Sequence, residues 1–149
     1  MWLARDSLCQ GKEVAIKVYQ RVFQSIKVAQ AVATELSIMR QLAKVNHPNI
    51  VKVLDFIGHS SDADGPQEEG GVAVVMEYLP MTLEDALAKS PGMFKSQTLI
   101  TEVMRSLLSA ISLLHKLRII HRDLKPGNIL ISIEDEWATL GFSKHKEPF

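Results

Sequence analysis

The sequence predicts an α+β fold in which a sheet-rich first part is followed by a mainly helical second part. Short segments rich in β-forming residues fill most of residues 1–78, and one long pattern typical of an amphipathic helix lies between them. Beyond residue 80, apolar residues recur mainly at three- and four-residue steps, which is typical of helices packed on one face. Strands and helices segregated along a chain favour the α+β class, with a seam near residues 77–80.

The first part carries the strand signals. Residues 13–19 are rich in β-branched residues and follow a glycine, so they predict a strand. Residues 2–5 predict its hairpin partner across a turn at 6–11. Residues 50–56 and 72–78 predict two further strands, and the polar, acidic, glycine-rich segment between them indicates a solvated loop.

An amphipathic helix is predicted over residues 28–45. Its apolar residues recur at helical spacing: Val28, Val32, Leu36, Met39 and Leu42/Ala43. The segment His47-Pro48-Asn49 follows, and a proline shortly after a periodic pattern is a signal that the helix ends.

The second part begins with a short helix predicted at residues 83–88. Ser96 is a candidate N-cap for a long helix, because its hydroxyl can accept a hydrogen bond from the first turn. The predicted apolar face of that helix contains Ile100, Val103/Met104, Leu107, Ile111 and Leu114. A polar loop is predicted within residues 119–128, and a final hairpin is predicted to pair residues 129–131 with residues 136–140.

Composition narrows the functional class. The 149 residues contain 17 Lys+Arg and 17 Asp+Glu, so the formal net charge is zero. Nucleic-acid binders and polybasic membrane-surface domains usually carry a basic excess, so neither class is expected. No apolar run is long enough for a transmembrane helix. A single cysteine, Cys9, excludes a disulfide within the chain and suits an intracellular location, cytoplasmic or nuclear.

The residues that carry chemistry lie in two segments. Residues 121–128 read His-Arg-Asp-Leu-Lys-Pro-Gly-Asn, and residues 14–17 read Val-Ala-Ile-Lys. Together they closely resemble the protein kinase family, in its serine/threonine branch and with features similar to the cyclin-dependent kinases. The resemblance continues through Glu35 and residues 47–51 and 75–79. It implies a bilobal fold and ATP-dependent phosphoryl transfer to serine or threonine of a protein.

The resemblance assigns a nucleotide-binding role to Lys17 and Glu35. Lys17 would be a fixed cation for the α- and β-phosphates of ATP, which suits a reaction that depends on neutralising phosphate charge. Glu35 would be the helix carboxylate that pairs with this lysine. The plainer reading of Glu35 is an exposed helix carboxylate with no such role.

The 121–128 loop would carry the phosphoryl-transfer residues. By resemblance, Asp123 is the catalytic base, Lys125 contacts the transferred phosphate and Asn128 is an oxygen ligand for Mg²⁺. His121 is expected to be a structural core residue rather than an acid–base group.

The adenine pocket is also implied by resemblance. The backbone carbonyl of Glu77 and the amide of Leu79 would face adenine. Ala15 and Leu130 would enclose the ring, and Met76 would close the back of the pocket. The plainer reading of Met76 and Leu130 as core residues is compatible with these roles.

Two departures concern the extent of the pattern. The glycine-rich phosphate loop of the family would precede Trp2, and most of the activation segment would follow Phe149. We therefore expect a partial kinase domain over residues 1–149. Residues 1–79 would form the N-lobe and hinge without that glycine-rich loop, and residues 80–149 the first part of the C-lobe through the catalytic loop.

A third departure is the absence of an Asp-Phe-Gly sequence after Asn128, where residues 137–141 read Trp-Ala-Thr-Leu-Gly. Either Thr139 and Leu140 replace the Asp and Phe, or an Asp-Phe pair is missing between Leu140 and Gly141. The second reading is favoured because two added residues would restore the usual family spacing. In either case Mg²⁺ would lack a carboxylate ligand, so its binding is doubtful.

We therefore expect phosphoryl transfer by this chain alone to be absent or severely impaired, with roughly a thousandfold or greater loss. The expected partners are ATP, a protein substrate and a regulatory protein. The main alternative is a pseudokinase-type scaffold that binds nucleotide or protein. A third reading is a non-functional product whose helix near residues 96–116 exposes its apolar face.

Overall fold

The computed structural model describes residues 1–6, 11–59 and 71–131. The chain divides into two compact units, Met1–Tyr78 and Leu79–Phe149. Sheet dominates the first unit and helix the second, as expected for an α+β chain. None of the helices in the described part is long and apolar enough to cross a membrane.

The first unit is built on a four-stranded antiparallel sheet with the order β1-β2-β4-β3. Its strands are β1 (Trp2–Asp6), β2 (Lys12–Tyr19), β3 (Val53–His59) and β4 (Gly71–Glu77). The predicted hairpin is present, with Trp2 opposite Ile16 and Asp6 opposite Lys12. β2 also pairs with β4 along its length, so the lysine of the Val-Ala-Ile-Lys segment lies inside the sheet.

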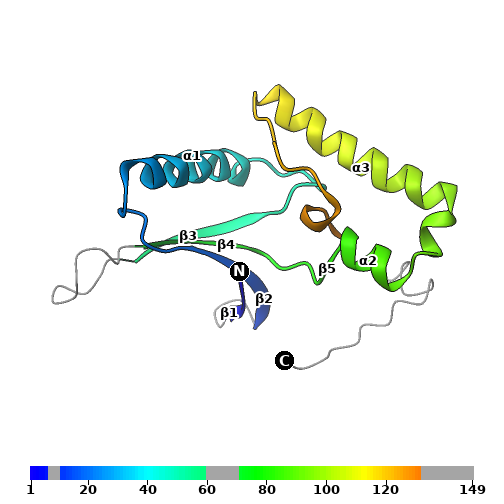
Figure 1. Cartoon of the computed structure of the whole chain (residues 1–149), viewed down its shortest axis with the longest axis horizontal. Helices are drawn as coiled ribbons and strands as arrows, with labels where there is room; N and C mark the ends of the chain where they lie inside the picture. Colours follow the sequence, from blue (N-terminus) through cyan, green and yellow to red (C-terminus); the bar gives the residue numbers. More distant parts are fainter. Residues whose placement is uncertain (7–10, 60–70, 132–149) are drawn as a thin grey trace. The chain divides into compact units, whose positions relative to one another are not determined.

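Helix α1 (Ile26–Ala43) lies against one face of this sheet (Figure 1). It begins two residues earlier than predicted because the Ser25 hydroxyl caps it, accepting the amide N–H of Val28 at 3.3 Å. The core between helix and sheet consists of Leu36, Val53, Val74 and Met76. Burial of this one apolar stripe fixes which side of α1 faces the strands.

Strand β3 starts and ends three residues later than the predicted strand at 50–56. A turn after α1 explains the shift. The amide of Ile50 donates to the carbonyl of His47 at 3.2 Å, and the amide of Asn49 donates to Nδ1 of His47 at 3.2 Å. Pro48 suits the second position of such a turn, so the chain becomes extended only beyond it.

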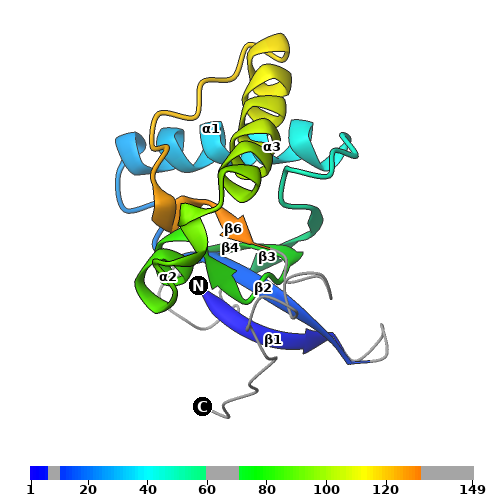
Figure 2. The same ribbon diagram turned by 90° about the vertical axis from the view of Figure 1, so that its right-hand side faces the viewer.

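The second unit contains helices and one short ladder (Figure 2). Its elements are β5 (Met81–Thr82), α2 (Leu83–Lys89), η1 (Met93–Lys95), α3 (Gln97–Lys116), η2 (Pro126–Asn128) and β6 (Leu130–Ile131). Strand β6 pairs antiparallel with β5, with Thr82 opposite Leu130. The partner predicted for β6, residues 136–140, lies outside the described residues.

Both helices begin at hydroxyl N-caps. Ser96 caps α3 as predicted, accepting the amide of Leu99 at 3.4 Å. At α2, the Thr82 hydroxyl accepts the Asp85 amide while the Asp85 carboxylate accepts the Thr82 amide, each at 3.1 Å. This reciprocal capping box satisfies donors that a helix start otherwise leaves without partners.

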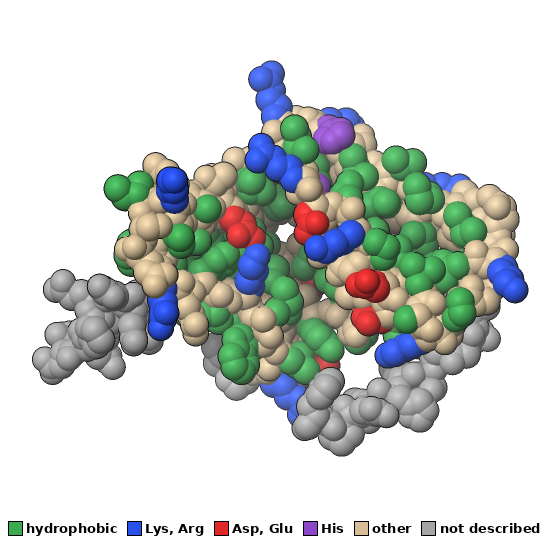
Figure 3. Space-filling model, viewed as in Figure 1, with side chains coloured by type: hydrophobic (Ala, Val, Ile, Leu, Met, Phe, Trp, Pro, Cys, Tyr) green, Lys and Arg blue, Asp and Glu red, His purple; other side chains and the backbone are tan. Residues whose placement is uncertain are grey.

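Helix α3 buries most of the face that was predicted, since Leu114 is buried and Val103, Leu107 and Ile111 are half-buried. Leu99, Ala110 and Leu114 are buried, whereas Ile100 and Met104 of the predicted face are 37% and 46% exposed. Figure 3 shows hydrophobic side chains at the surface over this helix. The buried stripe is shifted toward Leu99 and Ala110, which leaves Ile100 and Met104 at the exposed edge of the predicted face.

The end of α3 adopts a Schellman motif with an arginine at its left-handed position. Ile119 donates its amide to the carbonyl of Leu114 at 2.8 Å, and Arg118 donates to His115 at 2.9 Å. Arg118 has φ of 60°, a conformation that favours glycine. Leu114 and Ile119 are both buried, which is the hydrophobic pairing typical of this motif. Their burial keeps Arg118 in its left-handed conformation.

Replacing this arginine should therefore stabilise the chain. We expect Arg118→Gly to raise the free energy of unfolding by about 0.5–1 kcal/mol, which is the relief of left-handed strain less the added entropy of unfolded glycine. Urea titration of the full chain measures the change. Arg118→Ala is the control, because it removes the charge but keeps the Cβ; an equal gain from alanine would contradict the strain explanation.

Candidate functional site

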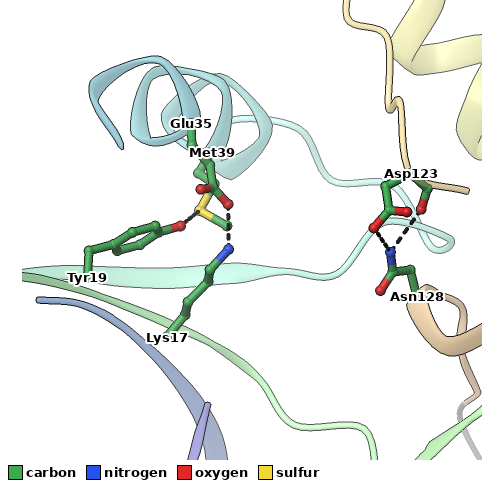
Figure 4. A network of polar contacts seen from close by, with 6 residues as sticks. All are labelled: Lys17, Tyr19, Glu35, Met39, Asp123 and Asn128. Atoms are coloured by element: carbon green, nitrogen blue, oxygen red, sulfur yellow. Dashed lines mark hydrogen bonds and ion pairs between the residues drawn. The ribbon is translucent and has the colours of Figure 1, made fainter. Parts of the chain in front are cut away.

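Lys17 on β2 and Glu35 on α1 form an ion pair within the first unit. The Lys17 ammonium lies 2.5 Å from Oε1 of Glu35, and the two side chains are 36% and 42% exposed (Figure 4). Glu35 directly precedes the buried Leu36, so its side chain lies at the edge of the core, next to Lys17. Glu35 is therefore a partly buried, paired carboxylate and not a free one on the helix surface.

The protonated form of Lys17 is favoured by its neighbours. Burial lowers the pKa of Lys17, but hydrogen bonding with Glu35 and then Tyr19 outweighs it and leaves the pKa above its ordinary value. Lys17 is thus a fixed cation at neutral pH. Its contribution to stability is complete below the ordinary pKa of lysine and is lost as the pH rises through the raised value.

Tyr19 is a neighbour of Lys17 that the motif comparison does not bring out. It lies two residues beyond Lys17 on β2, so both side chains leave the same face of the strand. The Lys17 ammonium is 5.0 Å from the centre of the Tyr19 ring. The Tyr19 hydroxyl donates to Sδ of Met39 at 3.7 Å (Figure 4). The i to i+2 spacing on a predicted strand was the signal available in the sequence.

In the second unit, the residues of the 121–128 loop gather around the Asp123 carboxylate (Figure 4). The Asn128 side-chain amide donates to Oδ2 of Asp123 at 2.7 Å and to the Asp123 carbonyl at 2.8 Å. The Lys125 ammonium lies 3.0 Å from the same Oδ2. The three residues predicted to act together are thus brought together by one short loop.

This arrangement keeps Asp123 ionised. The Lys125 ammonium, followed by the Asn128 amide, holds the pKa of the Asp123 carboxyl below its usual value. Because both Asp123 and Lys125 are largely exposed, solvent screens their attraction, and the pair orders the loop more than it stabilises the fold. An ionised, solvent-facing carboxylate with a cation beside it can accept a hydrogen bond from an approaching hydroxyl.

His121 differs from expectation. It is exposed rather than a core residue, and its Nδ1 accepts the amide N–H of Asp123 at 3.3 Å. The imidazole ring folds back onto its own loop, and this hydrogen bond supports the backbone at Asp123. Between them Arg122 has φ of 67°, in the left-handed region. Such strain persists only where surrounding contacts hold the chain.

The end of the loop is anchored to the start of α2. The amide of Leu83 donates to the carbonyl of Ile129 at 2.7 Å, next to the β5–β6 ladder. A Cβ at position 127 would lie 2.6 Å from Oε2 of Glu84. Gly127 therefore lets the Glu84 carboxylate approach the loop, a contact that the sequence motif alone did not reveal.

The residues predicted to surround adenine are divided between the units. In the first unit, Ala15 on β2 is opposite Met76 on β4, and both are buried. The Glu77 carboxylate accepts the amide of Lys52 at 2.7 Å. In the second unit, Leu79 is half-buried, and Leu130 lies on β6 and is 37% exposed. Their roles toward a nucleotide stay predictions.

A divalent cation would find limited support in the described residues. Because Asn128 donates to Asp123 through its amide nitrogen, its Oδ1 is left to act as an oxygen ligand. No group of three or more His, Cys, Asp or Glu side chains suited to a metal occurs in residues 1–6, 11–59 and 71–131. The donor set therefore fits Mg²⁺ only if phosphate oxygens supply most of its ligands, as is common for Mg²⁺ with nucleotides.

The sequence of this chain is similar to those of known protein kinases. A model of the protein kinase domain matches residues 6–143. Cell division control protein 2 homolog 3 of Trypanosoma brucei brucei is 34% identical over 125 residues, which cover 84% of this chain and 36% of that protein. Cyclin-dependent kinase 4 of Xenopus laevis is 33% identical over 132 residues, covering 89% and 40%.

Serine/threonine-protein kinase ATG1c of Arabidopsis thaliana is 30% identical over 153 residues, covering 99% of this chain and 19% of that protein. The chain thus spans about two fifths or less of the relatives it matches. The family model covers nearly its whole length, including both segments that carry the site. The chain belongs to the protein kinase domain family, in its serine/threonine branch.

Proposed function

We propose that this chain binds ATP and carries the residues for phosphoryl transfer to serine or threonine of a protein. The loop around Asp123 carries the proposal, since it presents an ionised carboxylate whose Oδ2 is shared by the Lys125 ammonium and the Asn128 amide. Phosphoryl transfer depends on positioning and charge neutralisation more than on covalent chemistry. This loop offers both.

Each loop residue has a distinct task in the proposal. Asp123 accepts a hydrogen bond from the substrate hydroxyl and orients its oxygen toward the phosphorus. Lys125 neutralises charge on the transferred phosphoryl group. Asn128 would offer Oδ1 to a bound Mg²⁺, which would neutralise negative charge on the phosphates.

The first unit would hold the nucleotide through residues of its sheet and of α1. Lys17 contacts the α- and β-phosphates, and Glu35 holds its ammonium in place. Ala15 and Met76 contact the adenine ring, while the carbonyl of Glu77 recognises its edge.

The chain by itself is proposed to transfer phosphate poorly. Residues 137–141 read Trp-Ala-Thr-Leu-Gly and contain no carboxylate for Mg²⁺. The same observation supports a second candidate function, a pseudokinase-type scaffold that binds nucleotide or a protein partner without transfer. A regulatory protein partner and an intracellular location, cytoplasmic or nuclear, belong to both versions of the proposal.

ATP affinity tests the nucleotide half of the proposal. Lys17→Met should weaken binding of ATP by roughly 10- to 100-fold, the value of about 1.5–3 kcal/mol for a hydrogen bond to a charged group. Isothermal titration with ATP, with and without Mg²⁺, measures the change. Lys27→Met, at an exposed position of α1, is the matched control and should bind like the parent. Absence of ATP binding by the parent chain would reject this half.

The electrostatic role of Lys125 has its own test. Lys125→Met removes the main cause of the lowered pKa of Asp123, so we expect that pKa to rise toward its usual value. Carboxyl carbon NMR across an acid titration follows the group. In Lys89→Met, which loses a lysine from α2, Asp123 should titrate as in the parent. An unchanged Asp123 in Lys125→Met would mean that the ion pair does not form in solution.

Restoring the missing aspartate distinguishes an impaired kinase from a scaffold. Inserting Asp-Phe between Leu140 and Gly141 should raise Mg²⁺-dependent phosphorylation of a serine-containing protein by roughly a thousandfold, since each 1.4 kcal/mol is tenfold. Radiolabelled ATP gives the rate. Asp123→Asn in the inserted chain should lower it again by roughly a hundredfold or more. No gain on insertion, in a chain that binds ATP, would favour the scaffold.

A further inference from the structure

The ion pair with Glu35 is by itself a weak restraint on the Lys17 ammonium. Both side chains are more than a third exposed, and pairs at that level of exposure are screened by water. A lysine side chain also has several rotatable bonds, so a single carboxylate contact leaves its ammonium considerable freedom. A further contact is needed if the ammonium is to stay in place.

Tyr19 supplies such a contact from a second direction. The Lys17 ammonium lies 5.0 Å from the ring centre, within the roughly 6 Å at which a cation is attracted to an aromatic face. The residues are two apart on one strand, so the backbone of β2 alone brings ring and ammonium together. This contact does not require Glu35.

The ring is itself held by the helix that carries Glu35. The Tyr19 hydroxyl donates to Sδ of Met39 at 3.7 Å, and the ring packs against the core of Leu36, Val53, Val74 and Met76. Met39 is four residues after Glu35, one turn along the same face of α1. Two successive turns of α1 therefore support the lysine, one directly and one through the tyrosine.

We propose that Tyr19 is a positioning residue that holds the Lys17 ammonium through its aromatic face, in parallel with Glu35. Its role toward ATP rests on the function proposed above, whereas the contact with Lys17 does not. Among the described residues, Glu35 and Tyr19 raise the Lys17 pKa, Tyr19 through its hydroxyl, so the effects of hydroxyl and ring must be separated by comparing Tyr19→Phe with Tyr19→Leu.

The test compares substitutions at position 19 in the full chain. Tyr19→Leu removes the aromatic face, Tyr19→Phe keeps it without the hydroxyl, and pentafluorophenylalanine at this position keeps the ring shape but reverses its quadrupole. The readouts are the Lys17 pKa in the nucleotide-free chain, from NMR of labelled lysine, and the affinity for ATP from isothermal titration.

We expect Tyr19→Leu and the fluorinated chain to lower the Lys17 pKa by a few tenths of a unit and to weaken ATP binding about twofold to fivefold. Tyr19→Phe should keep most of the ATP affinity, because the aromatic face remains, and any lowering of the Lys17 pKa in this variant measures the hydroxyl alone. In a Glu35→Gln background, the loss caused by Tyr19→Leu should be larger, because each contact compensates for the other.

Phe56→Leu is the matched control. Phe56 on β3 packs against the same core, and its ring lies 5.4 Å from the Arg40 guanidinium, so it also makes a cation–π contact. Its loss should lower stability but leave Lys17 and ATP affinity unchanged.

Several outcomes would overturn the proposal. The first is that the fluorinated ring changes the Lys17 pKa no more than Phe56→Leu does. Another is an equal loss in Tyr19→Phe and Tyr19→Leu, which would assign the effect to the hydroxyl. If the parent chain fails to bind ATP while the Lys17 pKa still falls in Tyr19→Leu, the proposed function is rejected and the positioning contact stands.

Discussion

Packing of α1 against one face of the sheet is the constraint on which the first unit depends. Leu36 must be buried against Val74 and Met76, and that requirement sets the rotation of the helix about its axis. The neighbouring Glu35 then emerges at the edge of the contact, where Lys17 leaves the central strand β2. The Lys17–Glu35 pair is thus a consequence of apolar burial, since packing of the core is enough to place the Glu35 carboxylate near Lys17.

The 121–128 loop follows a different principle. Its functional side chains are exposed, and they are held by short-range hydrogen bonds and not by a core. The left-handed backbone at Arg122 and the bond from Leu83 to Ile129 fix the path of the chain on either side of Asp123. A loop of this kind keeps its geometry locally, while its carboxylate stays accessible to a substrate.

Periodicity and capping chemistry predicted the hairpin, α1, α2 and the start of α3, because these signals are local in the sequence. The family motif within 121–128 singled out Asp123, Lys125 and Asn128, and the loop brings these three side chains together. The start of β3 was missed because hydrogen bonds to His47 delay the strand. The exposure of Ile100 and Met104 at the edge of the predicted α3 face was missed because it depends on which neighbours cover the helix. Glu84 was missed because its approach to Gly127 joins separate segments, whereas Tyr19 was missed because it lies outside the motif, although its i+2 spacing from Lys17 was visible in the sequence.

The approach of Glu84 to Gly127 ties two positions together. Because the atom nearest the missing Cβ is the end of a flexible side chain, a larger residue at 127 would displace the carboxylate instead of the backbone. The position of the Glu84 carboxylate near the end of the 121–128 loop is therefore adjustable from residue 127, which has no charge of its own. Substitution at residue 127 would change the surroundings of the 121–128 loop without altering any of its ionisable groups.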